Sequence, residues 1–166
     1  MSVVFVGLGG NKGDVKSAFV EAVQLFRTFG RVIGCSSLYL TSPQDGVEGG
    51  MFLNAVCKLE LELSPWELLE KVLSLQRAMG KQGRLEPRIL DIDILAYDRE
   101  VIKSRGLEIP HPRMHLRRFV LEPLWELDPD FVHPVLGKKV EEMLGGLEGQ
   151  GRVERQCNTE DWWCAS

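Results

Sequence analysis

The positions of hydrophobic and polar residues predict a strand, a helix and a second strand in the first part of the chain. Residues 3–8 form a short apolar run that ends among glycines, a pattern typical of a buried strand followed by a tight turn. Apolar residues then recur at helical spacing over residues 15–29, where Gly30 is a typical helix stop. Residues 31–40 are rich in β-branched and aromatic side chains, which favours a strand.

The middle of the chain predicts a loop, a strand and a second helix. Proline and several glycines make residues 41–50 a loop, whereas residues 51–63 alternate polar and apolar side chains as a half-buried strand does. Ser64 and Glu67 have the spacing of a capping box, with Pro65 at the first helical position. The buried stripe of the helix that follows is expected to contain Leu68, Val72, Leu75 and Met79.

The last elements come after a short polar loop. Residues 88–97 predict a strand, which a turn at residues 98–100 connects to a short partner strand at residues 101–102. Helical periodicity returns over residues 116–127 and, more briefly, over residues 138–144. The resulting order β-α-β-β-α-β predicts an α+β protein with the ferredoxin-like split β-α-β sandwich, an antiparallel sheet with two helices packed on one face.

Length and composition favour a single domain. The chain has 166 residues, of which 44% are hydrophobic, enough to bury a substantial core. We assign residues 1–145 to the domain and residues 146–166 to a C-terminal tail that is glycine-rich and then polar. The tail is expected to be partly disordered, with Trp162 and Trp163 docking locally at most.

Charge and cysteine content narrow the function classes and the compartment. A net charge of −4 and a sequence pI near 5.5 argue against a protein that wraps nucleic acid. The chain has no apolar stretch of about 18 residues and no basic signal region at its start. The four cysteines lack CxxC spacing, which favours reduced thiols. We expect a cytoplasmic monomer or weak dimer with no nucleic-acid or membrane partner.

Asp91 and Asp93 form the most informative pair of polar residues. Two positions apart in a strand, they project from the same face, while Leu90, Ile92 and Ile94 project from the other. Neighbouring carboxylates repel each other unless a cation joins them, and such hard oxygen ligands suit Mg²⁺ together with substrate phosphates. The alternative is an acidic pair on a solvated strand face that has no function.

Basic side chains gather around this pair in a chain that is acidic overall. Together they could neutralise a triphosphate and the charge that develops on it during group transfer. Each of them taken singly fits a solvated surface charge equally well. The residues are Lys81, Arg84, Arg88, His111, Arg113, Arg117 and Arg118.

Three further features allow either a ligand or a structural role. Asn54 is an amide within an otherwise apolar strand, so either a flat heterocycle or the backbone could satisfy it. Phe119 could stack on such a ring or belong to the core. The glycines in residues 7–11 match neither GxGxxG nor the GxxxxGK[ST] phosphate loop, so we interpret them as a structural strand-to-helix turn that needs close backbone approach.

Several motifs resemble one enzyme family. They are Pro87-Arg88-Ile89-Leu90-Asp91-Ile92-Asp93-Ile94, Ile109-Pro110-His111-Pro112, Arg117-Arg118-Phe119, Val6-Gly7-Leu8-Gly9-Gly10-Asn11, Ser37-Leu38-Tyr39-Leu40-Thr41-Ser42-Pro43 and Phe52-Leu53-Asn54-Ala55. With these motifs the chain resembles the 6-hydroxymethyl-7,8-dihydropterin pyrophosphokinases of folate biosynthesis over most of residues 3–136.

The resemblance implies a pyrophosphoryl transferase that uses ATP as co-substrate. In this family two Mg²⁺ ions, held by the aspartates that match Asp91 and Asp93, bridge the triphosphate and the pterin hydroxyl. The hydroxyl attacks the β-phosphorus, and AMP leaves. Such a reaction needs alignment and charge neutralisation more than covalent catalysis. The residues implied as catalytic are Arg88, Asp91 and Asp93.

The same resemblance implies two sets of binding residues. The ATP-binding set is Gln76, Lys81, Arg84, Arg88, Ile94, His111, Pro112 and Arg117. The pterin-binding set is Thr41, Ser42, Pro43, Asn54 and Phe119. Within the second set, Phe119 is expected to stack on the pterin and Asn54 to hydrogen-bond it.

Some positions depart from the pattern of the family. The family usually has a longer, arginine-rich lid loop with a tryptophan, whereas this chain has the short segment 83–86 with Leu85 at that place. Gln76 stands where a glutamate is common. The short lid leaves open a paralogue that binds pterin or nucleotide without turnover. The other alternative, a ferredoxin-like RNA-binding module, is disfavoured by the acidic pI and by strands without the aromatic and basic residues of such modules.

Overall fold

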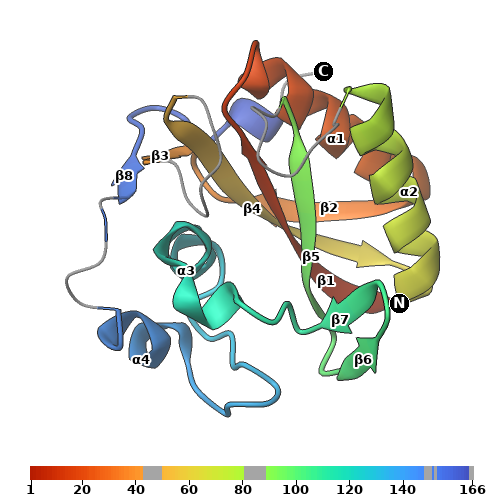
Figure 1. Cartoon of the computed structure of the whole chain (residues 1–166), viewed down its shortest axis with the longest axis vertical. Coiled ribbons are helices and arrows are strands. Elements are labelled where there is room, and N and C mark those ends of the chain that lie inside the picture. The colour runs from red at the N-terminus through yellow and green to blue at the C-terminus, as the bar shows by residue number, and fades with distance from the viewer. Residues whose placement is uncertain (43–49, 81–88, 148–150, 152, 165–166) are drawn as a thin grey trace.

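A single antiparallel sheet organises the chain (Figure 1). The computed structural model describes residues 1–42, 50–80, 89–147, 151 and 153–164. The strands of this sheet and the first two helices are β1 (Ser2–Gly10), α1 (Val15–Phe29), β2 (Gly30–Cys35), β3 (Tyr39–Thr41), β4 (Phe52–Leu61), α2 (Pro65–Ala78), β5 (Asp91–Tyr97) and β8 (Val153–Arg155). The strands run in the order β5-β1-β4-β3-β8, and β2 also pairs with β4.

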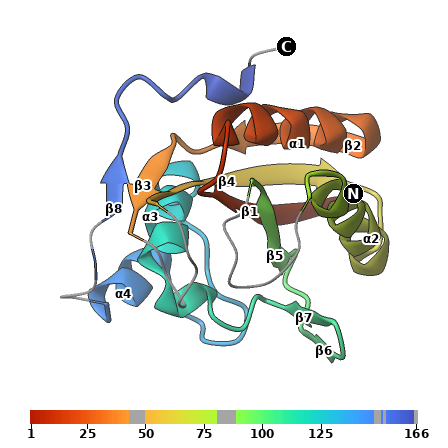
Figure 2. The same cartoon turned by 45° about the horizontal axis from the view of Figure 1, so that its top comes forward.

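This topology confirms the predicted ferredoxin-like α+β fold. Strand β1 lies between β4 and β5. The order is β-α-β-β-α-β when β2 and β3, which pair with opposite ends of β4, are counted as one strand. Three helical elements follow β5: the 3-10 helix Met114–Leu116, α3 (Arg118–Leu127) and α4 (Val140–Gly145). They lie toward the face of the sheet opposite to the one that α1 and α2 cover (Figure 2).

Each face of the sheet has its own hydrophobic core. Phe19 of α1 and Leu68 of α2 pack in one core with Ile92 of β5. On the opposite face, Leu121 of α3 packs in a second core with Val56 of β4. Alternate residues of a strand therefore enter different cores, and this alternation decides which polar side chains face α3.

Both long helices begin at a capping side chain, of which the sequence predicted only the second. Asp14 accepts hydrogen bonds from the backbone N–H and the hydroxyl of Ser17, at 3.1 and 2.8 Å, and α1 ends at Phe29. The predicted capping box is confirmed, because Ser64 and Glu67 exchange hydrogen bonds of 2.9 and 3.2 Å at the start of α2.

The glycines at positions 7, 9 and 10 lie in a strand and not in a turn, so the predicted turn was wrong, whereas the predicted close backbone approach is confirmed at Gly10. Strand β1 continues through Gly10, and Gly9 pairs with β4 on one side and β5 on the other. A Cβ atom on Gly10 would collide with the carbonyl oxygen of Ile89. Close backbone approach is thus the reason for glycine at position 10, and the turn follows only at residues 11–14.

The strand predicted at residues 31–40 is split in two, because the chain leaves the ladder at residues 36–38. Strand β2 pairs with one end of β4 and β3 with the other. At the break, the backbone N–H of Ser36 donates to the Val56 carbonyl at 2.8 Å, and the Ser36 hydroxyl accepts from the Val56 N–H at 3.0 Å. A side-chain oxygen replaces the backbone carbonyl there, which period-2 alternation does not reveal.

The predicted pairing of residues 101–102 with the preceding strand was also wrong. Strand β6 (Ile102–Ser104) pairs with β7 (Leu107–Ile109) in a separate hairpin, where Gly106 has a φ of 91°. The preceding turn residue Asp98 extends the pairing with β1 instead, since it exchanges hydrogen bonds of 2.8 Å with Val3. The turn therefore directs the chain away from β5.

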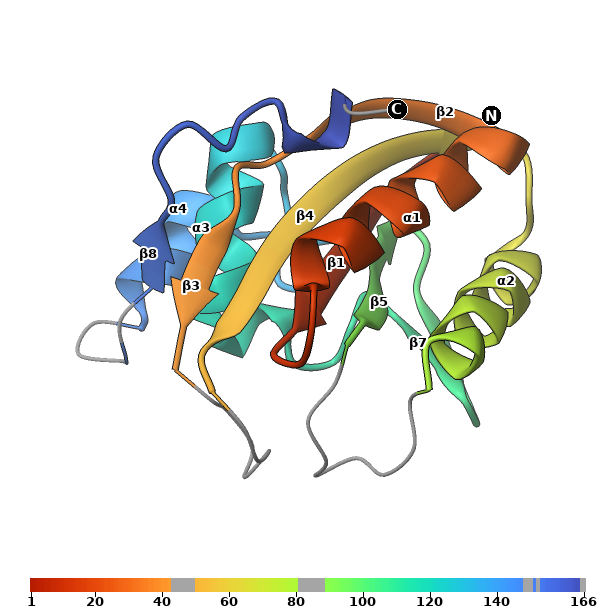
Figure 3. The ribbon, with the colours of Figure 1, turned by 90° about the horizontal axis from the view of Figure 1, so that it is seen from above.

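The C-terminal segment, residues 153–164, packs against the domain. Strand β8 adds to the free edge of β3, and a 3-10 helix at Trp162–Cys164 follows near α1 (Figure 3). Trp162 is only 4% exposed, with its ring 5.8 Å from that of Phe19. Residues assigned from the sequence to a partly disordered tail thus contribute a strand and a core tryptophan.

Candidate active site

Register pairing brings distant polar residues into one row across the sheet. Asp91 of β5 lies opposite Gly9 of β1, Gly9 opposite Asn54 of β4, and Asn54 opposite Tyr39 of β3. Residues directly opposite each other in an antiparallel sheet project from the same face. That face is the one covered by α3, since Val56, two positions from Asn54, enters the α3 core.

Glycines occupy the middle of this row. Gly9 lies opposite Asp91, and Gly7 lies opposite Asp93. A Cβ atom on Gly9 would lie 3.2 Å from Oδ1 of Asn54. The strip of β1 between the carboxylates and the amide therefore carries no side chains. This role was not predicted from the sequence, although glycine at alternate positions of an apolar strand is a signal for it.

The carboxylates face two cationic or potentially cationic side chains. The ring Nε2 of His111 lies 3.9 Å from Oδ1 of Asp93, and the guanidinium Nη1 of Arg117 lies 3.9 Å from Oδ2. Both residues were predicted to gather around the pair, and the structure brings both to Asp93. Arg118 instead forms an ion pair of 3.1 Å with Glu122 on its own helix. We call Asp91, Asp93, His111 and Arg117 the acidic side of the site.

His111 is held in one orientation by its own loop. Its backbone N–H donates to the Leu95 carbonyl at 2.8 Å, and its ring Nδ1 accepts from the Arg113 N–H at 3.1 Å. Burial lowers the pKa of His111, an effect that the carboxylate of Asp93 opposes and the guanidiniums of Arg117 and Arg113 reinforce. The neutral ring with its proton on Nε2 fits these contacts, and that N–H points toward the acidic pair.

Gln76 anchors the acidic strand from the other face of the sheet. It is 3% exposed, and its side-chain oxygen accepts a 2.5 Å hydrogen bond from the backbone N–H of Ile92. Ile92 lies between Asp91 and Asp93, so α2 fixes the strand at the acidic pair. The contact is with protein, and the predicted ATP contact of Gln76 stays a prediction.

Two of the predicted pterin residues, Asn54 and Thr41, lie on adjacent strands at the amide end of the row. Asn54 is 5% exposed, and Thr41 on the neighbouring strand is 2% exposed. The Thr41 hydroxyl donates to the carbonyl of Ser42 at 2.9 Å. Phe119, at the start of α3, lies 5.4 Å from the guanidinium of Arg117, which links it to the acidic side. We call Thr41, Asn54 and Phe119 the amide side of the site.

The remaining predicted residues differ in how the structure places them. Ile94 is 6% exposed in the core on the α1 and α2 face, whereas Pro112 is exposed beside His111. Four predicted site residues lie outside the described residues: Pro43, Lys81, Arg84 and Arg88.

The two carboxylates of the site could supply only part of the ligands of a metal ion. Within the described ranges no group of three or more histidine, cysteine, aspartate or glutamate side chains could hold a metal ion. Asp91 and Asp93 on one face of β5 supply two carboxylates. This set fits Mg²⁺, which commonly takes one or two carboxylates and completes its shell with waters and substrate phosphates.

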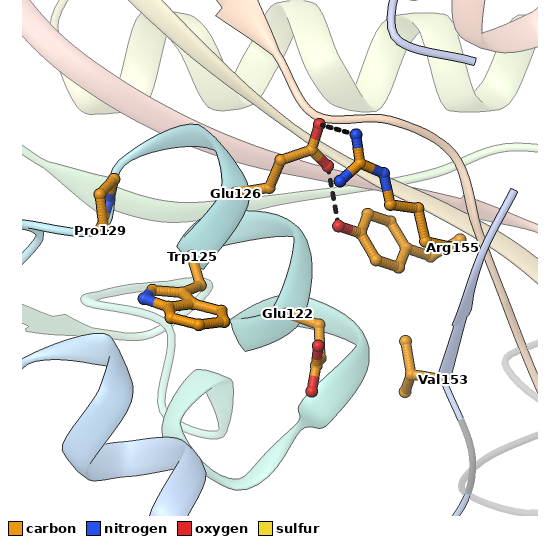
Figure 4. Close-up of a pocket in the computed structure, with 7 residues that line it drawn as sticks. Glu122, Trp125, Glu126, Pro129, Val153 and Arg155 are labelled. Atoms are coloured by element: carbon orange, nitrogen blue, oxygen red, sulfur yellow. Dashed lines mark hydrogen bonds and ion pairs between the residues drawn. The ribbon is translucent and has the colours of Figure 1, made fainter. Parts of the chain in front are cut away.

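A cavity of about 490 Å³ opens between α3 and the edge strands β3 and β8 (Figure 4). Its lining contains no predicted substrate residue. Strands β3 and β8, which form one wall, are the part of the sheet next to the amide side. The lining residues are Tyr39, Glu122, Trp125, Glu126, Pro129, Val153 and Arg155.

Fold and site together define the class of the protein. Paired carboxylates with a histidine and an arginine beside them suit phosphoryl transfer, which depends on positioning and charge neutralisation. Residues 5–129 match the family described as 7,8-dihydro-6-hydroxymethylpterin-pyrophosphokinase. The chain belongs to this family of folate biosynthesis.

Curated relatives agree with the family assignment, and solved structures agree with the fold. The chain is 36% identical over 144 residues to a 2-amino-4-hydroxy-6-hydroxymethyldihydropteridine pyrophosphokinase of Aquifex aeolicus, covering 86% of this chain and 90% of the relative. It is 39% identical over 159 residues to the protein of that name from Methylorubrum extorquens, covering 93% and 99%. The fold is similar to that of Plasmodium falciparum HPPK-DHPS solved with pteroate, with a TM-score of 0.73 and 15% identity over 87% of this chain and 44% of that one.

No helix among the described residues is both long and apolar enough to cross a membrane.

Proposed function

We propose that the protein transfers the pyrophosphoryl group of ATP to the hydroxymethyl group of 6-hydroxymethyl-7,8-dihydropterin and releases AMP. The observation that carries the proposal is the row Asp91, Gly9, Asn54, because it sets carboxylates and a buried amide on either side of a strip without side chains. A phosphate chain at the acidic side and a heterocycle at the amide side would meet over that strip. Family membership supports the same reaction.

The acidic side would bind and align the phosphates. Asp91 and Asp93 would hold two Mg²⁺ ions, whose chemistry when bound is to neutralise and orient phosphate oxygens. Arg117 offers a permanent positive charge, and His111 offers a neutral N–H donor directed by its loop. Arg88 is proposed as a further catalytic residue. The remaining nucleotide contacts proposed are Gln76, Lys81, Arg84, Ile94 and Pro112.

The amide side would orient the pterin. Asn54 has donors and acceptors that match the edge of a heterocycle, and Phe119 offers a ring for stacking. Thr41, Ser42 and Pro43 would close the pocket beside them. Orientation of the hydroxymethyl group toward the phosphates is worth more to this reaction than covalent assistance.

We infer the cytoplasm as the place of action and a monomer or weak dimer as the working form. The cysteines of the sequence lack CxxC spacing, which supports a reducing compartment.

Identification of the released nucleotide tests the proposed function. The purified protein is mixed with Mg-ATP, with and without 6-hydroxymethyl-7,8-dihydropterin, and the products are separated by anion-exchange chromatography. We expect AMP, and only when the pterin is present. ADP would instead indicate single phosphoryl transfer, and pterin binding without nucleotide release would favour a binding protein.

A further inference from the structure

The C-terminal segment satisfies the backbone at the break between β2 and β3. The indole Nε1–H of Trp162 donates to the Ser36 carbonyl at 2.8 Å. The Leu38 N–H donates to the hydroxyl of Thr159 at 3.0 Å, and the Leu38 carbonyl accepts from the Gln156 N–H at 2.8 Å. Groups that leave the sheet ladder here therefore find partners more than 110 residues later in the chain.

Glu126 of α3 satisfies the remaining residue of the break and reaches both edge strands. Its carboxylate accepts from the Ser37 N–H at 3.0 and 3.1 Å and from the Ser37 hydroxyl at 2.8 Å. It also accepts from the Tyr39 hydroxyl at 2.8 Å and lies 3.4 Å from the guanidinium of Arg155 (Figure 4). One carboxylate thus joins α3, β3 and β8.

These contacts lie next to the amide side of the site. Thr41 pairs with Val153 and Tyr39 with Arg155, so β8 covers the whole length of β3. Phe119 is on the same helix as Glu126, about two turns earlier. The pKa of Tyr39 is raised, first by burial and then by its hydrogen bond to Glu126, so its hydroxyl stays a donor at neutral pH.

We propose that Glu126 and Arg155, together with the C-terminal segment that carries Arg155, are positioning residues for the pterin substrate. They fix β3, which carries Thr41, relative to α3, which carries Phe119. The inference rests on the proposed function, because it assigns the amide side to the pterin. A purely structural role of the segment would instead affect stability without separating the two substrates.

Steady-state kinetics of single variants separate the two roles. Arg155→Ala is expected to raise the KM for the pterin about two- to fivefold, the range for a half-exposed ion pair, and to leave the KM for ATP unchanged. Glu126→Gln is expected to raise the KM for the pterin about tenfold, because three donors, the Ser37 N–H and the hydroxyls of Ser37 and Tyr39, lose a charged acceptor. Arg155→Lys keeps the charge and should restore part of the loss.

Arg31→Ala is the matched control. Arg31 forms an ion pair with Glu60 at the same distance of 3.4 Å, but at the opposite end of β4 from Asn54. Equal KM values for the pterin in Arg155→Ala, Arg31→Ala and the unsubstituted protein would overturn the inference, even if Arg155→Ala melts at a lower temperature. Absence of AMP from the unsubstituted protein would overturn the proposed function and this inference with it.

Discussion

The acidic side and the amide side of the site are built in different ways. The carboxylates of the acidic side lie on β5, a strand of seven residues paired with the central strand β1. Thr41 of the amide side lies on β3, which has three residues. The break at residues 36–38, directly before β3, is held by hydrogen bonds to partners 89 to 126 positions away. A site can therefore combine a half encoded in one short motif with a half assembled from remote segments.

Removing a carboxylate of the acidic side should have the largest effect on the reaction rate. Asp91→Asn and Asp93→Asn are each expected to lower the rate of AMP release at least about 100-fold, as loss of a group that stabilises charge in the transition state does. The melting temperature should change little, because both side chains are partly exposed. Asp130→Asn, at an exposed loop position, is the control. Near-normal rates in both site variants would contradict the proposal that Asp91 and Asp93 hold Mg²⁺.

A side chain on the strip should disturb the junction between the two sides. Gly9→Ala places a Cβ atom 3.2 Å from Oδ1 of Asn54, so the amide must shift. Small displacements at a reacting site can cost about 100-fold, and we expect the kcat/KM for the pterin to fall at least about tenfold. Gly145→Ala, with no atom within 4 Å of the added Cβ, should have no effect. Equal kcat/KM values for the two variants would contradict the proposal that the substrates meet over this strip.

Loss of the Gln76 amide should weaken the anchor of the acidic side. Gln76→Leu leaves the buried N–H of Ile92 without an acceptor, which costs about 1–3 kcal/mol. Urea unfolding should show this loss, and Gln24→Leu on the exposed face of α1 should not. Unchanged stability would mean that another group accepts the hydrogen bond from the Ile92 N–H.

The smallest effect is a pH dependence far from the site. His133 is 4% exposed, and its Nδ1 accepts from the N–H groups of Val135 and Leu136 at 3.2 and 3.1 Å. Burial, and next the nearby His115, lower the pKa of His133 in the folded protein. Its stabilising contribution is therefore complete above the unfolded pKa of about 6.5 and is lost as the pH falls through the lower folded value.

Denaturant titrations at several pH values measure this dependence. His133→Asn retains an acceptor for the two N–H groups but does not titrate, so its unfolding free energy should vary less between neutral and mildly acidic pH. Parallel curves for the two proteins would show that other groups govern the acid sensitivity.

The sequence by itself determined the fold class, both capped helices and the acidic pair. These features depend on spacing within a few residues: the Ser64 and Glu67 cap, the helical stripe of α1, and two aspartates at alternate positions of a strand. The family motifs likewise are contiguous strings, so the resemblance to the family depends on local sequence.

Only the tertiary structure decided the row across the sheet, the break at residues 36–38 and the docking of residues 153–164. The place of Gly9 between Asp91 and Asn54 follows from the register of three strands, and register is set by pairing between distant segments. The polar groups at the break are satisfied by Glu126 and by the C-terminal segment, which no local pattern specifies. Nonlocal hydrogen bonding and burial, rather than local propensity, therefore completed the amide side of the site.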